Sequence, residues 1–276
     1  MNNLAGQRPL EQTECKRLVL ERDGKTLIVH LSTGHKANAF CLETMQELTL
    51  LANAVAEDMD IAAVILTGQP QIFSAGMNLS DPSVLDPASV DLQQLRRGAA
   101  IGAKMCRAWE EIEAITISAI EGVCVGAGVA LSLALDLRVC AQVSVLYVPE
   151  IERGMNMSWQ SVPRSVNLIG PAKTKRMFAL AEKVSARQAF DWGWADYLSE
   201  PGKSLEKALE IAKGVEKLPP ISVRMCKQSI NVAANALNHA VSYMDADQLV
   251  VTQHSEDYQE GIQSFLEKRD PHYQGK

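Results

Sequence analysis

Short apolar runs and amphipathic stretches alternate along the chain, and their periods predict its elements. From 18 to 31, two β-rich runs flank Asp23-Gly24, a turn pair that predicts a hairpin. From 42 to 56, Met45, Leu48 and Val55 recur at helical spacing. Further apolar runs predict strands at 62–68, 115–120, 137–141 and 143–148, and helical patterns predict helices at 90–112, 126–135, 172–181, 185–193, 205–217 and 221–267.

The order of these elements predicts an α/β protein. Strands and helices alternate up to about residue 200, and the remainder is helical with a break at Pro219-Pro220. We therefore predict an α/β core over residues 1–200 and a helical region over residues 201–276. Residues 1–14 are expected to be loosely ordered. Residues 80–88, which are rich in Pro, Ser and Asp, are expected to form an exposed loop.

Composition narrows the classes of function. The 276 residues are 47% hydrophobic and 22% charged, which is ordinary for a globular protein. A net charge of -6 argues against a nucleic-acid partner. The first residues lack a basic region followed by an apolar one, and Glu121 and several glycines interrupt the apolar stretch 114–135, so we expect neither a secretory signal nor a membrane span. The expected location is cytoplasmic, with an organellar matrix left open.

Cysteine and histidine give no sign of cross-links or metal. None of the six cysteines forms a C-x-x-C pair, and most have apolar neighbours, so free thiols in a reducing compartment are expected. The five histidines are dispersed without the spacing of metal ligands, and no metal site is expected.

Two glycine-rich turns and one carboxylate carry the candidate chemistry. The first turn is Phe-Ser-Ala-Gly-Met-Asn-Leu at 73–79, and the second, at 121–129, runs into an apolar helix. Small residues let backbone N–H groups approach a ligand, and a helix N-terminus adds unpaired donors. Two such donor sets aimed at one oxygen make an oxyanion hole, and a nearby carboxylate such as Glu150 can move protons. The sequence therefore predicts carbonyl chemistry that passes through an enolate.

Several motifs occur in a fixed order that points to a known family. They are Lys36-Ala37-Asn38-Ala39, the turns at 73–79 and 121–129, Asp136-Leu137-Arg138, Gly170-Pro171-Ala172 and the segment 261–269. Through them, residues 18–273 resemble the enoyl-CoA hydratase/isomerase (crotonase) superfamily. The resemblance implies a spiral of ββα units and an all-helical C-terminal trimerisation region, giving a homotrimer or a dimer of trimers. It also implies an acyl-CoA thioester substrate, with coenzyme A present only as part of that substrate and no permanent cofactor.

The resemblance also implies roles for individual residues. The backbone N–H groups of Met77 and Ala127 would hold the thioester oxygen. The acyl pocket would include Ala130, Ser158 and Trp159, and the loop 80–88 with the following helix would set acyl-chain size. The residues implied to contact coenzyme A, the last two from the final helix of this or a neighbouring subunit, are Lys36, Ala37, Ala39, Ser74, Ala75, Phe265 and Lys268.

The count of carboxylates favours one reaction. Hydratases of the superfamily use two glutamates, and the matching positions here hold Ala130 and Glu150, while a third acidic position of some relatives holds Ser158. One base can remove the α-proton of a 3-enoyl thioester and return it to the γ-carbon. The superfamily's single-glutamate isomerases keep their acid at the position of Glu150. We therefore favour an enoyl-CoA isomerase, in which an apolar setting raises the pKa of Glu150.

Other interpretations stay open at this stage. Hydration, decarboxylation or the formation or cleavage of a carbon–carbon bond could use the same scaffold, with another group, or water held by Ser158, supplying the missing function. A catalytically idle CoA-binding or interaction subunit is the alternative outside enzymology. The structural alternative for Glu150 is an ion pair with Arg153 or another cation. Glu152 is expected to point away if the strand continues, and Asp136, at a helix end, is expected to be structural.

Overall fold

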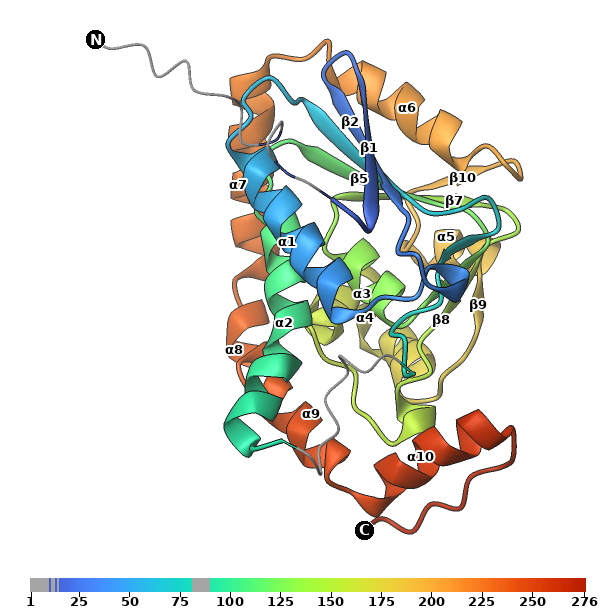
Figure 1. The fold of residues 1–276 in the computed structure, drawn as a ribbon. Coiled ribbons are helices and arrows are strands. Elements are labelled where there is room, and N and C mark those ends of the chain that lie inside the picture. The colour runs from blue at the N-terminus through green and yellow to red at the C-terminus, as the bar shows by residue number, and fades with distance from the viewer. Residues whose placement is uncertain (1–9, 11–12, 14, 81–89) are drawn as a thin grey trace.

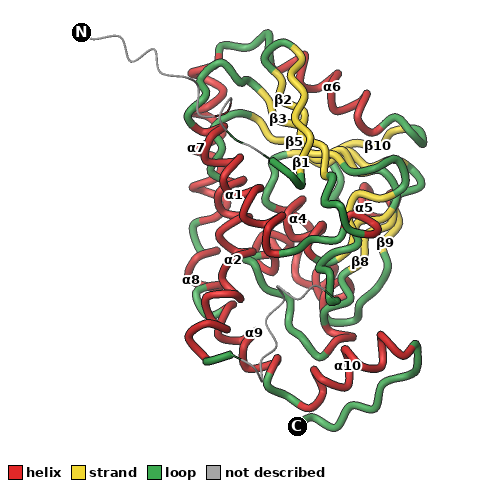
Figure 2. The backbone as a smooth tube through the Cα atoms, in the orientation of Figure 1, coloured by secondary structure: helices red, strands yellow, loops and turns green. Residues whose placement is uncertain are grey.

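The computed structural model describes residues 10, 13, 15–80 and 90–276. The predictions for residues 1–14 and for the loop 80–88 therefore fall almost wholly outside the described residues. In the described part, two β-sheets lie beside a layer of helices, with helix α6 (Ser204–Val215) at one end and helix α10 (Glu256–Glu267) at the other (Figure 1). Coloured by secondary structure, the strands gather on one side of the molecule, while helices fill the opposite side and the C-terminal end (Figure 2).

The larger sheet has six strands. Its order is β1 (Leu18–Asp23), β2 (Thr26–Leu31), β3 (Ala63–Thr67), β5 (Ile115–Ile120), β7 (Leu137–Ala141) and β10 (Tyr197–Ser199). The predicted hairpin is confirmed, because β1 and β2 pair antiparallel with Leu18 opposite Leu31. The remaining pairs are parallel.

The smaller sheet carries the strand ends from which the candidate site is built. Its order is β4 (Ile72–Ser74), β6 (Val123–Val125), β8 (Val145–Tyr147) and β9 (Val184–Ser185). The first three strands are parallel, so their carboxyl ends meet at one edge of the sheet. Both glycine-rich turns and Glu150 follow these three ends.

The helices connect the two sheets into a spiral, as expected. Strands β3 and β4 lead to α2 (Leu92–Glu110), β5 and β6 lead to α3 (Ala127–Leu133), and β7 and β8 lead to α4 (Ser161–Phe178). Each ββα unit places one strand in each sheet. The other helices are α1 (Leu42–Ala56), α5 (Ala186–Trp192), α7 (Pro220–Asn235), α8 (Asn238–Ser242) and α9 (Asp245–Gln253), and two 3-10 turns are η2 (Lys36–Asn38) and η3 (Ile151–Arg153).

Both faces of the six-stranded sheet are buried, which explains its continuous apolar strands. In β3, Val64 and Leu66 face the main core, while Ile65 faces the opposite side. That opposite side is covered by α6, which packs Ala208 and Ala212 on the sheet. The first helix of the C-terminal region therefore contributes to the core of the sheet.

Three parts of the predicted element map are wrong. Four of the five strands of two or three residues, β4, β6, β9 and β10, were not predicted, because so short a run shows no period, whereas the fifth, β8, lies within the predicted strand 143–148. Helix α4 begins at Ser161 rather than 172, because Gly170 (φ 77°) and Pro171 join two helical segments that the pattern separates. The predicted helix 221–267 is four helices, with α10 capped by the Ser255 hydroxyl, which accepts from Tyr258 N.

Candidate active site

In the first glycine turn, the N–H of Met77 points away from Phe40, the residue paired with it. Phe40 N donates to Gly76 O and Asn78 N donates to Phe40 O, both at 2.8 Å, so Met77 is the central residue of a parallel bridge. In such a bridge the central N–H and C=O point away from the partner strand. Gly76 has a φ of +86°, a conformation that suits glycine, and its N–H donates to Ser74 Oγ.

The second turn begins a helix beside the first turn. Gly126 (φ +47°) donates its N–H to Tyr147 O at 2.9 Å, and α3 starts at Ala127. The amide at this first helical position has no intrahelical acceptor. A Cβ built on Gly76 would lie 3.6 Å from Ala127 N, so the two turns touch. The amide groups of Met77 and Ala127 therefore start from adjacent backbone.

Glu150 follows β8 and reaches back over the second turn. A Cβ built on Gly126 would lie 2.5 Å from Glu150 Oε1, so only glycine leaves room for the carboxylate there. Glu150 Oε2 is buried without a hydrogen-bond partner. Burial raises the pKa of Glu150 to about 7, against smaller lowering effects of a backbone hydrogen bond and of Arg153. The carboxyl group is thus poised to gain or lose a proton near neutral pH.

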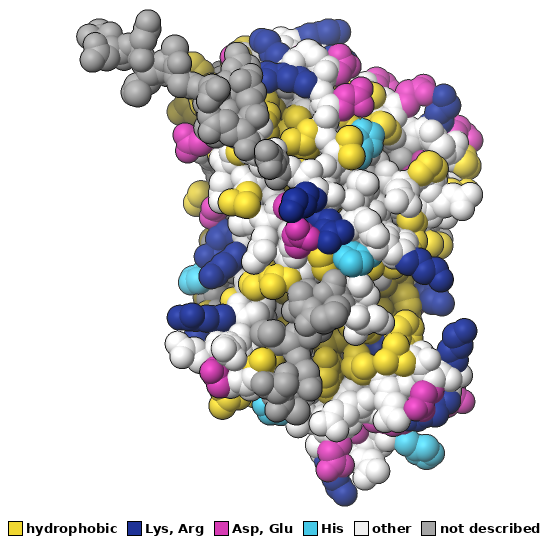
Figure 3. Space-filling model, in the orientation of Figure 1, with side chains coloured by type: hydrophobic (Ala, Val, Ile, Leu, Met, Phe, Trp, Pro, Cys, Tyr) yellow, Lys and Arg dark blue, Asp and Glu magenta, His cyan; other side chains and the backbone are white. Residues whose placement is uncertain are grey.

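One cavity of about 570 Å³ joins these groups. Hydrophobic side chains gather around the middle of the face that Figure 3 shows, between the body of the molecule and α10. The predicted site residues that line the cavity are Ala39, Ala75, Met77, Ala127, Ala130, Glu150, Ser158, Trp159 and Phe265, whereas Lys36, Ala37, Ser74 and Lys268 are not among its lining residues.

The cavity holds a single carboxylate among the described residues that line it, that of Glu150, and a single guanidinium, that of Arg153. Ala130 is buried in the wall, one helical turn after Ala127, and offers only a methyl group. Ser158 supplies a hydroxyl but no charge. The arrangement can stabilise an oxyanion and carry one proton on a carboxylate.

The comparison with known proteins agrees with this geometry. The sequence profile of the Enoyl-CoA hydratase/isomerase family matches residues 21–276. The chain belongs to this family.

Two relatives match this chain along almost their whole length. It is 24% identical to the short-chain-enoyl-CoA hydratase of Clostridium acetobutylicum over 257 residues, which cover 93% of this chain and 97% of the relative. It is 25% identical to the crotonyl-CoA hydratase of Syntrophomonas wolfei, over 95% and 99% of the two chains. The fold is also that of an enoyl-CoA hydratase crystal structure from Mycobacterium avium subsp. paratuberculosis, with a TM-score of 0.84, 16% identity and coverage of 95% and 100%.

Glu152 does not line the cavity, although the reason differs from the one expected. The strand ends at Tyr147, and a 3-10 turn follows from Ile151. In that turn Glu152 accepts a hydrogen bond from the Tyr147 hydroxyl and lies 3.7 Å from Arg153 Nη1. Arg153 therefore has its ion pair with Glu152, and no ion pair joins it to Glu150 among the described residues.

The C-terminal helices close one side of the cavity, a feature that the sequence analysis assigned only to Phe265 and Lys268. Gly261 of α10 packs directly on the Arg153 backbone, and the Arg153 guanidinium lies 4.0 Å from the centre of the Phe265 ring. The lining residues that the sequence analysis missed here are Leu249, Gln253, Tyr258 and Leu266. The sequence does carry a signal for α10, because Tyr258, Ile262 and Phe265 with Leu266 recur at helical spacing and form one apolar stripe.

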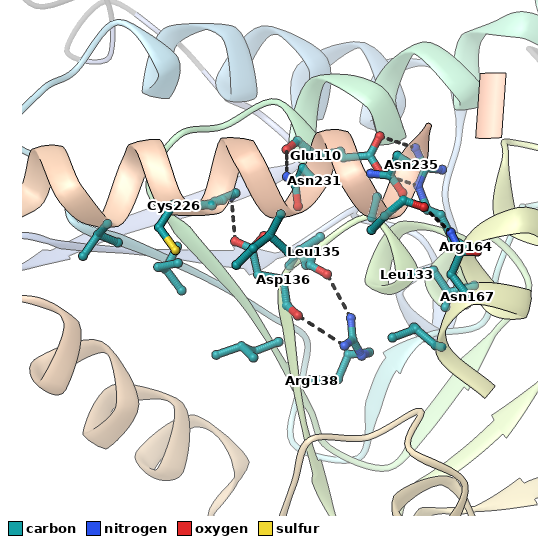
Figure 4. A pocket seen from close by; sticks show the side chains of 18 of the residues that line it. Glu110, Leu133, Leu135, Asp136, Arg138, Arg164, Asn167, Cys226, Asn231 and Asn235 are labelled. Carbon is teal, nitrogen blue, oxygen red and sulfur yellow. Dashed lines mark hydrogen bonds and ion pairs between the residues drawn. The ribbon is translucent and has the colours of Figure 1, made fainter. Parts of the chain in front are cut away.

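A second cavity of about 650 Å³ lies between α3, α4 and α7 (Figure 4). Its charged side chains all have partners, and four of them pair with one another. Arg164 pairs with Glu110 at 2.8 Å, and Lys227 pairs with Asp136 at 2.6 Å. Asp136 also accepts from Thr116 N at 2.7 Å, so its expected structural role is confirmed. This cavity contains neither glycine turn and has no carboxylate free for proton transfer among its described lining residues.

Two global expectations can be compared with the described residues. All six cysteines are free, as expected. None of the described helices combines the length and the apolar character that crossing a membrane requires.

Proposed function

We propose that this enoyl-CoA hydratase/isomerase moves a double bond in an enoyl-CoA thioester, with Glu150 as its only proton carrier. The observation that carries the proposal is the cavity itself. It contains a single described carboxylate, whose pKa burial raises to about 7, beside two adjacent backbone turns. A general base with a pKa near the working pH is efficient in both directions of proton transfer.

The reaction needs one base and one oxyanion site. Glu150 removes a proton from C2 of a 3-enoyl thioester, and the electron pair moves onto the thioester oxygen to give a dienolate. The N–H groups of Met77 and Ala127 donate to that oxygen while it is charged. The protonated Glu150 then returns the same proton to C4, and the double bond lies between C2 and C3. No atom is gained or lost.

Hydration is the second candidate, because the named relatives include hydratases. Water addition requires one group to activate water and another to protonate C2. Ala130 provides no second carboxylate, and Ser158 has no charge. Losing a positioned acid or base lowers a rate by a factor of ~10²–10⁴, so the isomerisation is the faster of the two reactions in this proposal.

We assign the coenzyme A part of the substrate to the contact residues that the sequence predicts. Ala39, Ala75 and Phe265 line the cavity, which supports their assignment. Ser74 does not line the cavity, and its hydroxyl donates to Asn38 O at 2.9 Å and accepts from Gly76 N. Lys36 is exposed, a position that suits contact with a phosphate outside the cavity. The other proposed contacts, outside the cavity wall, are Ala37 and Lys268.

The proposed assembly is a homotrimer or a dimer of trimers. Support comes from the C-terminal region, where α7, α8 and the residues between them expose apolar side chains that a monomer leaves in water. These are Ile221, Met225, Ile230, Val232, Leu237 and Val241. Because α6 packs on the sheet, the proposed oligomerisation role of residues 201–276 falls on the helices after it.

The direct test compares two reactions in three proteins. Wild type, Glu150→Gln and the matched control Glu152→Gln are assayed for isomerisation of 3-enoyl-CoA and for hydration of crotonyl-CoA. We expect Glu150→Gln to lower kcat for isomerisation ~10²–10⁴-fold, and Glu152→Gln to stay within a few-fold of wild type. Undiminished turnover in Glu150→Gln would refute the mechanism. Wild-type hydration faster than isomerisation would select the second candidate, and binding of CoA thioesters without either reaction would select the idle subunit.

A further inference from the structure

The cavity follows one face of helix α2 and stops at Trp159. Leu95 and Gly98 share that face and line the cavity. Gly102 is the next residue on the same face, but it is buried and does not line the cavity. A Cβ built on Gly102 would lie 1.9 Å from Cε2 of Trp159 and 2.3 Å from Cδ2. The indole therefore rests directly on the α2 backbone and blocks the groove at this point.

Beyond the indole, helix α2 runs into the packed core. The next turn of α2 carries Met105 and Cys106, both fully buried in the core. On the cavity side, the walls near the indole are apolar and include Ile101 and Met157. The single lining guanidinium, Arg153, is held against Phe265 of α10. An alkyl chain fits such an apolar blind end, whereas the phosphates of coenzyme A do not.

The backbone holds the indole in place from three elements. Trp159 and Gln160 both adopt left-handed conformations, with φ of 61° and 60°, which residues other than glycine seldom do. Arg164 of α4 donates to Trp159 O at 2.9 Å and is itself held by Glu110 of α2. Gln160 N donates to Asp245 of α9 at 2.8 Å. These bonds fix the backbone at Trp159, and the indole itself packs on the α2 backbone at Gly102, a contact that it would lose by swinging aside for a longer ligand.

We propose that Trp159 is the specificity-determining residue that ends the acyl part of the cavity, so that this enzyme selects short acyl chains. The inference rests on the proposed function, because it places the acyl chain next to Glu150 and along α2. It adds the substrate class, short-chain enoyl-CoA thioesters, and the residue that excludes longer ones.

Two substitutions act on the blind end in opposite directions. Trp159→Ala removes the wall and opens the groove toward Gly102. Gly102→Ala keeps the indole but adds a methyl group at the position that the ring occupies, so the ring must shift into the cavity. In the double variant the added methyl group meets no indole, so most of its effect should disappear. Trp192→Ala is the matched control, because Trp192 packs under Arg176 and does not line the cavity.

The experiment measures chain-length selectivity twice. The kcat/KM values for 3-hexenoyl-, 3-octenoyl-, 3-decenoyl- and 3-dodecenoyl-CoA report turnover, and calorimetric Kd values for the matching saturated acyl-CoAs report binding alone. Since one methylene in an apolar pocket changes selectivity by about 10–200-fold, we expect wild type to prefer the hexenoyl over the dodecenoyl substrate by at least ~100-fold. Trp159→Ala should reduce that preference at least ~10-fold, and Gly102→Ala should increase it.

The outcomes separate this inference from the proposed function. If wild type and Trp159→Ala show the same chain-length profile in binding, the inference is overturned, whatever the activity. If binding shows the expected profile but no substrate is isomerised, the proposed reaction fails while the role of Trp159 stands. A profile altered as strongly by Trp192→Ala as by Trp159→Ala would also overturn the inference, because the effect would then come from loss of any tryptophan.

Discussion

Replacing the proposed catalytic carboxylate should make the folded protein more stable at neutral pH. Burial raises the pKa of Glu150 to about 7 from an ordinary value of 4.5. Between these two pH values the folded chain keeps a proton that the unfolded chain has lost, so the free energy of unfolding falls as pH rises. At ~1.4 kcal/mol per pH unit, the whole penalty is roughly 3 kcal/mol, reached at about pH 7 and constant above it.

Glu150→Gln removes this penalty while keeping the shape of the side chain. Its amide nitrogen can be left without a partner, as Oε2 is now, and that offsets about 1 kcal/mol or more of the gain. We therefore expect the variant to be about 1–2 kcal/mol more stable than wild type at pH 8. Near pH 4.5, where the wild-type carboxyl is protonated in the folded chain, the gain should vanish.

Urea denaturation at both pH values, at one protein concentration, measures the difference. Glu121→Gln is the control, because this buried carboxylate accepts hydrogen bonds from Gly202 N at 2.9 Å and Ser204 N at 3.4 Å. The control should lose stability at pH 8, since its neutral amide weakens both bonds. A Glu150→Gln protein no more stable than wild type at pH 8 would refute the argument that the carboxylate is desolvated.

Three further predictions concern rate, backbone and core. Because Glu150 must be ionised to take the C2 proton, kcat/KM for isomerisation should fall about tenfold per pH unit below about 7 and stay level above it, and a profile that instead falls above pH 7 would assign Glu150 the role of an acid. Gly126→Ala should lower kcat ~10²–10³-fold, because its Cβ meets Glu150 and disturbs the proposed oxyanion turn. Gly202→Ala is the control: Gly202 also has a positive φ, +76°, but open space surrounds it, so the substitution should lower stability only. Circular dichroism checks the fold of both variants. Lys227→Met should lower the free energy of unfolding by about 3 kcal/mol, because it leaves the Asp136 carboxylate, which is only 18% exposed, without its cation, and equal denaturation midpoints would contradict this.

Elements with a long, clear period could be predicted from the sequence. The helix predicted at 42–56 is α1 to the residue, and the apolar run at 115–120 is β5. Three of the four strands of the smaller sheet, β4, β6 and β9, were not predicted, because they are two or three residues long and pairing with neighbours rather than local pattern decides them. The site nevertheless depends on that sheet, because three of its carboxyl ends carry the two turns and Glu150.

The candidate site also has parts that the sequence reveals and parts that it does not. Glycine marks the turns because Gly76 has a φ of +86° and Gly126 combines a φ of +47° with a ψ of −108°, conformations that a side chain disfavours, so these positions are visible in the sequence. The pairing of Trp159 with Gly102 is not visible, because 57 residues of chain separate a helix face from a left-handed turn. Contacts of that kind arise from packing, and no local pattern records them.

The arrangement separates what holds the oxyanion from what decides the reaction. The proposed donors are main-chain N–H groups at the ends of β4 and β6, and their positions depend on strand register and on Gly76 and Gly126 rather than on the side chains of Met77 and Ala127. The proposed proton carrier, Glu150, follows the end of the neighbouring strand β8. A change from glutamate to alanine at a position such as Ala130 therefore alters which protons can move without moving the donors. In the proposed mechanism the same backbone thus supports hydration or isomerisation, and the number of carboxylates around it selects between them.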